Sequence, residues 1–165
     1  MDRLFEGDPA PTKPFEELIS IKSENALGEM GTKRLIPWLR NSNLSDYIII
    51  ICDPRVKSPE LRDTARSLFK ELPKDLLSRT VIINADTPAE NRRWMKKSNV
   101  KDVNILSDEK REWMRGYTAL GENRWSMTMF VLADERVQKI AREMETIGAT
   151  KVVRNAVESM ESRRL

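Results

Sequence analysis

The stretch DYIIIICDPRVKSPELR, residues 46–62, decides the fold. Its β-branched apolar run over residues 47–51 is typical of a strand that is buried on both faces, in a parallel or mixed sheet. Cys52-Asp53-Pro54 ends the run, and a short basic loop follows. Ser58 then predicts a helix start, because serine is a favourable N-cap and proline follows it. In many α/β folds, a loop between such a strand and helix holds the reactive groups.

Strands and helices alternate along the rest of the chain. Apolar runs predict further strands over residues 80–83, 103–106, 126–132 and 137–142. Apolar stripes predict helices over 59–72, from 88 after a capping box at Thr87, after Ser107 as an N-cap, and over 149–160. This order implies a partly parallel sheet with helices on both faces. A closing hairpin makes the sheet mixed, although residues 137–144 also fit a helix.

The N-terminal part of the chain differs from the rest. Residues 1–14 hold three of the eight prolines and predict an extended arm on the domain or a partner, or else a frayed terminus. Residues 15–40 are weakly helical, with a second short helix expected over 33–40. We therefore divide the chain into an arm with short helices, residues 1–45, and one domain, residues 46–165.

Composition bounds the partners and the compartment. The chain of 165 residues has a net charge of +3, which permits an acidic or nucleic-acid partner without requiring one. Its longest apolar run is far shorter than the roughly 20 residues that span a bilayer, so we expect no membrane insertion. A single cysteine fits a reducing compartment. We expect a soluble intracellular protein, in the cytoplasm or an organelle interior, with no visible targeting segment.

The missing residue types exclude several chemistries. There is no histidine, which removes histidine metal sites and the Ser–His and Cys–His nucleophilic pairs. One cysteine cannot form a disulfide within the chain. No glycine-rich phosphate loop is present. We therefore expect no metal and no cofactor.

Three short stretches share a pattern with one family. PRVKSPEL, residues 54–61, has the proline and the hydroxyl residue of a P-x-x-x-T/S-x-x-C loop. Residues 104–121 are similar to an LLSD stretch followed by Y-x-x-x-G, and residues 129–134 to a TFVID strand with its turn. Together with the element order, these stretches resemble the thioredoxin fold and its peroxiredoxin branch, over residues 47–142.

The departures from that family change the function the resemblance implies. The peroxidatic cysteine of the family would fall at Leu61, and the thioredoxin CxxC within residues 55–60, which hold no cysteine. The cis-proline of thioredoxins would fall near Met127, and the family's arginine corresponds loosely to Arg124. The resemblance therefore implies a distant peroxiredoxin-like protein that lacks the catalytic cysteine.

Cys52 has two interpretations. As a redox or sensor site, its thiol pKa would be lowered by Arg55, Lys57 and the following helix N-terminus. As a structural residue, it would be a small buried hydrophobe that ends a strand, with Asp53 opposing thiolate formation.

Charged and aromatic groups give further candidates. Asp53, Asp86 and Asp108 each end a predicted strand, and they are either a metal or phosphoryl site or turn and cap residues. The stretch 92–101 surrounds Trp94 with basic residues, which suits RNA, an acidic protein or a solvated helix face. Arg124 and Trp125 suit an interface or a core lid.

We expect an α/β fold: a thioredoxin-like mixed sheet flanked by helices, with an N-terminal extension. Our main functional hypothesis is a redox-inactive protein-binding subunit, such as an assembly factor or scaffold in a larger complex, and not an enzyme. Its partner-binding residues would be Arg92, Arg93, Lys97, Arg124 and Trp125. One alternative is a one-cysteine redox enzyme or sensor, with Cys52, Arg55, Ser58 and Arg124 as its site; the other is nucleic-acid binding through the 92–101 helix.

Overall fold

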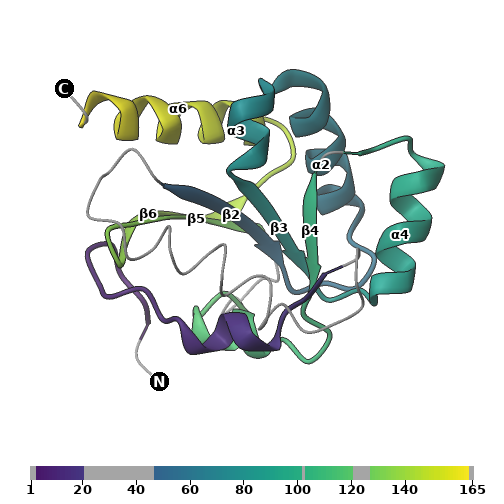
Figure 1. The fold of residues 1–165 in the computed structure, drawn as a ribbon, viewed down its shortest axis with the longest axis horizontal. Helices are drawn as coiled ribbons and strands as arrows, with labels where there is room; N and C mark the ends of the chain where they lie inside the picture. The colour runs from purple at the N-terminus through teal and green to yellow at the C-terminus, as the bar shows by residue number, and fades with distance from the viewer. Residues whose placement is uncertain (1–2, 21–46, 102, 121–126, 164–165) are drawn as a thin grey trace.

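One six-stranded mixed sheet forms the centre of the molecule (Figure 1). The structure, a computed structural model, describes residues 3–20, 47–101, 103–120 and 127–163. The strands are β1 (Ile19–Ser20), β2 (Ile48–Asp53), β3 (Thr80–Asn84), β4 (Asn104–Ser107), β5 (Met127–Ala133) and β6 (Arg136–Met144). Their order in the sheet is β1-β4-β3-β2-β5-β6, with β2, β3 and β4 parallel and the other pairs antiparallel.

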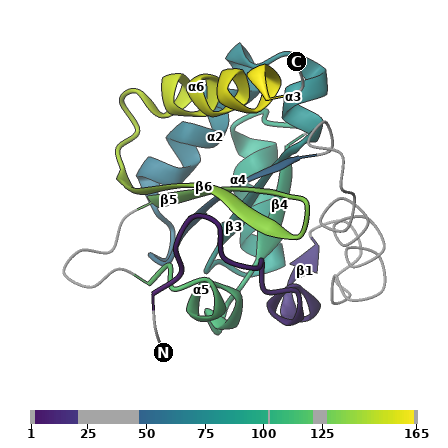
Figure 2. The ribbon, with the colours of Figure 1, turned by 90° about the vertical axis from the view of Figure 1, so that its left-hand side faces the viewer.

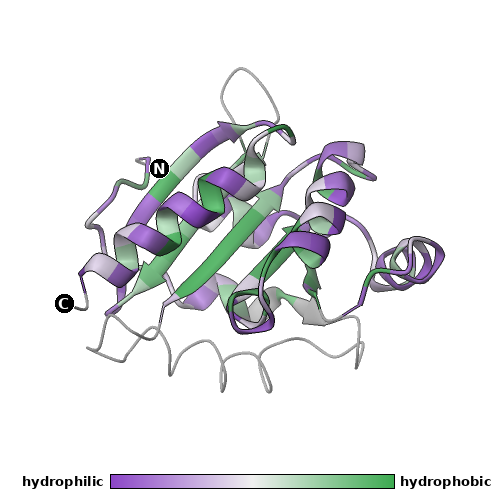
Figure 3. Ribbon diagram, turned by 90° about the horizontal axis from the view of Figure 1, so that it is seen from above, coloured by the Kyte–Doolittle hydropathy of each residue, from purple (hydrophilic) through white to green (hydrophobic). Residues whose placement is uncertain are grey.

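Helices cover both faces of this sheet. The described helices are the 3-10 helix η1 (Lys13–Glu17), α2 (Pro59–Glu71), α3 (Lys74–Ser78), α4 (Pro88–Lys97), α5 (Glu112–Gly116) and α6 (Ala149–Ser162). Side chains of α2, α4 and α6 build one apolar core with one face of the sheet. η1 and α5 lie on the other face, as Figure 1 shows, and contribute to a second core. Seen from above, the central strands show as hydrophobic, whereas the edge strand β6 and helix α6 carry hydrophilic residues (Figure 3).

The central strand β2 has the double burial that its sequence predicts. All six of its residues are buried. Ile50 pairs with Val81 of β3 on one side and with Phe130 of β5 on the other. Successive side chains alternate between the two cores, because a strand points neighbouring residues to opposite faces. Ile51 therefore belongs to the first core and Cys52 to the second.

The local signals for helices and turns are mostly confirmed. Ser58 caps α2, its hydroxyl accepting from the Leu61 amide, and Thr87 with Glu90 forms the full capping box of α4. The β5–β6 hairpin turns through Asp134 and Glu135, both with positive φ, as a two-residue hairpin turn requires.

The predicted cap at Ser107 is wrong. Helix α5 begins only at Glu112, and the Asp108 carboxylate accepts from the amides of Trp113 and Met114 in place of a serine cap. Arg111, in the left-handed region, turns the chain into this helix. Asp108 therefore caps α5, the role that the sequence had predicted for Ser107.

The predicted thioredoxin-like mixed sheet with flanking helices and an N-terminal extension is confirmed. Two short elements, β1 and α3, were not predicted. The helix expected over 33–40 lies outside the described residues, and so does the boundary at residue 45, which stays a prediction. Within the described ranges, no helix is both long and apolar enough to cross a membrane.

The N-terminal arm packs on the domain. Its backbone bonds to β6, with the Gly7 amide donating to Val137 O and the Ala10 amide to Glu135 O. Further along, Phe15 and Leu18 are fully buried. Figure 2 shows the arm running across β5 and β6 toward η1. We call residues 4–18 the N-terminal strap.

Candidate functional site

Cys52 lies near the carboxyl end of the central strand β2. Ile83 of β3 and Thr128 of β5 are its cross-strand neighbours. The thiol donates to the Thr128 carbonyl oxygen across 3.6 Å, and the residue is wholly buried. The one sulfhydryl of the chain is therefore at the sheet edge where α/β proteins hold ligands, but under a closed surface.

The surroundings of Cys52 keep its thiol protonated. Burial raises the thiol pKa most, and the Asp53 and Asp108 carboxylates raise it further. Arg142 lowers the pKa, but by less than these groups raise it. The lowered thiol pKa that our redox hypothesis predicted is therefore wrong, because the Cys52 pKa is raised. A thiol of this kind reacts slowly, because the thiolate is the nucleophile.

The basic residues expected to activate Cys52 bind carboxylates. Arg55 donates to Asp53 through Nε at 3.0 Å and Nη2 at 2.7 Å, and it also pairs with Glu60. These bonds raise the pKa of the Arg55 guanidinium. Lys57 Nζ lies 3.6 Å from a Glu90 carboxylate oxygen. Both positive charges are thus balanced by neighbouring carboxylates.

Asp53 organises the loop after β2. Besides Arg55, it accepts a hydrogen bond of 2.6 Å from the Ser58 hydroxyl. The same Ser58 oxygen accepts from the Leu61 amide, so the carboxylate, the cap and the first turn of α2 form one chain of bonds. Arg55 and Ser58 therefore meet at Asp53, and their role in a redox site with Cys52 stays a prediction.

Leu61 occupies the position that the motif pairs with the family's cysteine. It lies in the first turn of α2, only 2% exposed, and packs in the core on the opposite face of the sheet from Cys52. Its side chain is a hydrocarbon and contributes packing to this core.

The other two strand-end carboxylates act as structural acceptors. Asp86 accepts from the Lys57 amide at 2.7 Å and from Arg62 at 3.2 Å. Asp108 caps α5, and burial raises its pKa. Among the described residues, no group of three or more His, Cys, Asp or Glu side chains could hold a metal ion. The described contacts are those of turn and cap residues.

A buried amide network was missed in the sequence. Asn84 of β3 donates to Asn91 of α4 at 2.7 Å and accepts from it at 3.0 Å. Asn91 also donates to Ser107 of β4, and the Trp94 indole donates to Asn91. No pattern marks these residues, because polar side chains on a helix are usually solvated.

The basic stretch on α4 has a buried tryptophan. Trp94 is 6% exposed, and the guanidinium groups of Arg62 and Arg66 lie over its ring at 5.5 and 6.0 Å. A base cannot stack on a ring that is covered in this way. Arg93 and Lys97 point to solvent, and their role as partner-binding residues, with that of Arg92, stays a prediction. Arg124 and Trp125 lie outside the described residues.

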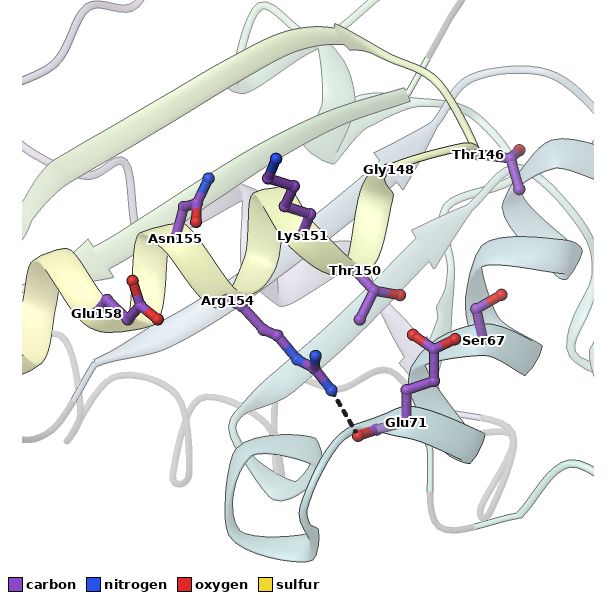
Figure 4. Close-up of a pocket in the computed structure, with 9 residues that line it drawn as sticks. All are labelled: Ser67, Glu71, Thr146, Gly148, Thr150, Lys151, Arg154, Asn155 and Glu158. Carbon is purple, nitrogen blue, oxygen red and sulfur yellow. Dashed lines mark hydrogen bonds between the residues drawn. The ribbon is translucent and has the colours of Figure 1, made fainter.

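A shallow polar groove lies between α2 and α6 (Figure 4). Its lining residues are Ser67, Glu71, Thr146, Gly148, Thr150, Lys151, Arg154, Asn155 and Glu158. Arg154 bridges it by donating to the Glu71 carbonyl oxygen at 3.2 Å. The two helices lie on the opposite face of the sheet from Cys52, so the groove is separate from the thiol.

Several solved structures with this fold are peroxiredoxins or peroxiredoxin-like proteins. A cysteine-to-serine mutant of PrxQ from Xylella fastidiosa has a TM-score of 0.72 at 11% identity, covering 96% of this chain and 98% of that chain. A peroxiredoxin-like protein from Aquifex aeolicus has a TM-score of 0.63 at 17% identity, covering 97% and 90%. The bacterioferritin comigratory protein of Xanthomonas campestris has a TM-score of 0.60 at 15% identity, covering 76% of this chain and 82% of that chain.

No protein-family model matches the chain, and no curated protein sequence matches it. At such low identities, the likeness to solved structures shows the fold. The chain is peroxiredoxin-like in structure, with the thioredoxin-like fold that its sequence predicts.

These neighbours correct our main functional hypothesis. A redox-inactive subunit of a larger assembly is contradicted, because the similar structures named above are peroxiredoxins or peroxiredoxin-like proteins, and one of them is described with alkyl peroxide reduction activity. They favour the alternative of a one-cysteine redox protein. The expected lack of a catalytic cysteine is not supported either, since Cys52 lies in the central strand β2, one residue before the strand ends.

Proposed function

We propose that this chain is a slow thiol redox sensor with a peroxiredoxin fold, in which Cys52 reacts with a hydroperoxide. The observation that carries the proposal is the place of the only sulfhydryl, at the carboxyl end of the central strand and beside the loop that Asp53 organises. The choice of a hydroperoxide is supported by the Xanthomonas neighbour, whose description concerns alkyl peroxide reduction.

The reaction is a two-electron oxidation of sulfur. The Cys52 sulfur attacks one oxygen of the O–O bond and becomes a sulfenic acid, while the hydroperoxide is reduced to an alcohol or to water. The thiol proton leaves with the other oxygen. Because the chain has a single cysteine, an external low-molecular-weight thiol has to restore it, by forming a mixed disulfide with loss of water and then exchanging with a second such thiol.

Burial and charge set the rate and favour a sensor over a turnover enzyme. The thiol pKa is raised, and the sulfur has no exposed surface in the closed conformation. Reaction therefore needs both an opening of the structure and loss of the proton, and each step lowers the rate. Such a thiol becomes oxidised during prolonged exposure to an oxidant, but it does not consume the oxidant rapidly.

The test is oxidation of the native protein by an alkyl hydroperoxide, read by peptide mass spectrometry. We expect the Cys52 peptide to gain one oxygen slowly, and a sulfenic-acid probe to label wild type and not Cys52→Ala. The eight methionines serve as an internal measure of general oxidation. If they are oxidised while Cys52 stays reduced in the folded protein, the proposal is wrong.

A further inference from the structure

The N-terminal strap lies on the face of the sheet that carries Cys52 (Figure 2). We propose that this strap, residues 4–18, is a releasable cover that gates the access of solutes to Cys52. The inference rests on the proposed function only in taking Cys52 as the reacting sulfur. The contacts of the strap carry the inference.

Backbone hydrogen bonds hold the outer half of the strap along β6. The Gly7 amide donates to Val137 O at 2.7 Å, and the Val137 amide donates back to Asp8 O at 2.9 Å. The Ala10 amide donates to Glu135 O at 2.8 Å. This outer half is therefore attached like a short edge strand, by a few backbone hydrogen bonds at the edge of the sheet.

One arginine connects the strap to α5 and to the thiol. Arg142 of β6 donates to Leu4 O at 3.1 Å and to Thr118 O at 2.8 Å. The Leu4 amide in turn donates to the Thr118 hydroxyl at 3.0 Å. The same Arg142 charge lowers the Cys52 pKa. Moving the strap therefore changes the partners of a charge that acts on the sulfur.

Phe15 is the apolar anchor of the inner half. Its ring meets Trp113 and Tyr117 of α5 edge-on, at centroid distances of 5.8 and 5.6 Å. The Tyr117 hydroxyl donates to the Pro11 carbonyl, which ties the strap to the same helix. Cys52 belongs to the apolar core that these rings build. Lifting Phe15 therefore removes part of the apolar core that also contains the thiol.

The elements on this face are short. η1 and α5 have five residues each, whereas α2 and α6 on the other face have 13 and 14. The Trp113 indole nitrogen is buried without a hydrogen-bond partner in the described parts of the chain, and an unsatisfied donor reduces the stability of its surroundings. Short elements with few internal hydrogen bonds are where local opening costs least. We therefore expect η1 and α5 to open before α2 and α6.

Gly116→Ala is the variant that tests the strap. A Cβ at Gly116 would lie 2.5 Å from Cγ of Pro14, so the added methyl wedges η1 away from α5. We expect the alkylation rate of Cys52 by iodoacetamide to rise at least about tenfold in the folded protein, the effect of a 1.4 kcal/mol easier opening. Arg115→Ala, an exposed change in the same helix, should leave the rate unchanged.

Two further variants keep the test decisive. Tyr117→Phe removes the hydrogen bond to Pro11 and keeps the ring, so it should also speed alkylation while the protein stays folded. Met160→Ala weakens the core on the opposite face. At equal loss of global stability, Met160→Ala should speed alkylation less than the strap variants. Equal effects, or no effect of either strap variant, would overturn the gate.

The outcomes separate the gate from the proposed function. Alkylation reports access to Cys52, whereas sulfenic-acid formation reports its reaction with hydroperoxide. Faster alkylation without oxidation would keep the gate and refute the redox function. Oxidation whose rate no strap variant changes would keep the function and refute the gate.

Discussion

At the scale of single residues, Cys52 should make stability depend on pH. Its folded-state pKa is raised above the free-thiol value of about 8.5, mainly by burial. The unfolded chain therefore loses this proton first as the pH rises. The stabilisation is complete below pH about 8.5 and falls by about 1.4 kcal/mol for each further pH unit, until the folded-state pKa is reached.

The measurement is urea unfolding of wild type and Cys52→Ala between pH 7 and about 10. Above that pH, tyrosine and lysine side chains also titrate. The difference between the two curves isolates the thiol, because every other group titrates in both proteins. We expect wild type to lose stability relative to the variant above pH about 8.5. A constant difference would contradict a raised thiol pKa.

At the scale of elements, Asn91 connects α4 to two strands. Its amide nitrogen donates to Asn84 of β3 and Ser107 of β4, and its oxygen accepts from the Trp94 indole. Asn91→Ala removes these hydrogen bonds from three buried side chains. We expect a loss of about 2–4 kcal/mol in the free energy of unfolding, measured by urea denaturation.

Arg93→Ala is the matched control for Asn91, because it changes an exposed residue of the same helix. Its expected effect stays within about 0.5 kcal/mol. If Asn91→Ala cost no more than this control, the amide network would contribute nothing measurable to the packing of α4.

The elements also show how far sequence patterns reach. The strands β2, β3 and β5 follow from apolar runs, and α2, α4 and α6 from stripes and caps. The pattern of β6 also fitted a helix, because polar residues interrupt its apolar ones. β1, with two residues, and α3, with five, are too short to carry a period. The position of Cys52 in a strand was predictable. The raised pKa of its thiol was predictable only in part. The sequence places Asp53 beside Cys52, but it does not show that Asp108, which follows β4, also lies close enough to raise this pKa.

At the scale of the whole molecule, one sheet separates two cores of different construction. Long helices cover the core that contains Leu61, whereas the strap, η1 and α5 cover the core that contains Cys52. If the proposed gate is right, the sheet keeps the fold while the strap opens, because the strap is held by hydrogen bonds to β6 and by the packing of Phe15 on Trp113.

Oxidation of Cys52 should in turn loosen the strap. A sulfenic acid adds an oxygen to a fully buried sulfur in a closely packed apolar core, where extra volume and an unpaired polar group both cost free energy. If opening the strap favours oxidation, linkage requires that oxidation favours opening.

We expect the amides of Gly7, Ala10 and Val137 to exchange at least about tenfold faster in the oxidised protein. The Val157 amide of α6 should be unchanged, and hydrogen exchange with mass spectrometry reads both regions. Uniform acceleration would mean that oxidation destabilises the whole fold, and unchanged strap amides would mean that the sulfur and the strap are not coupled.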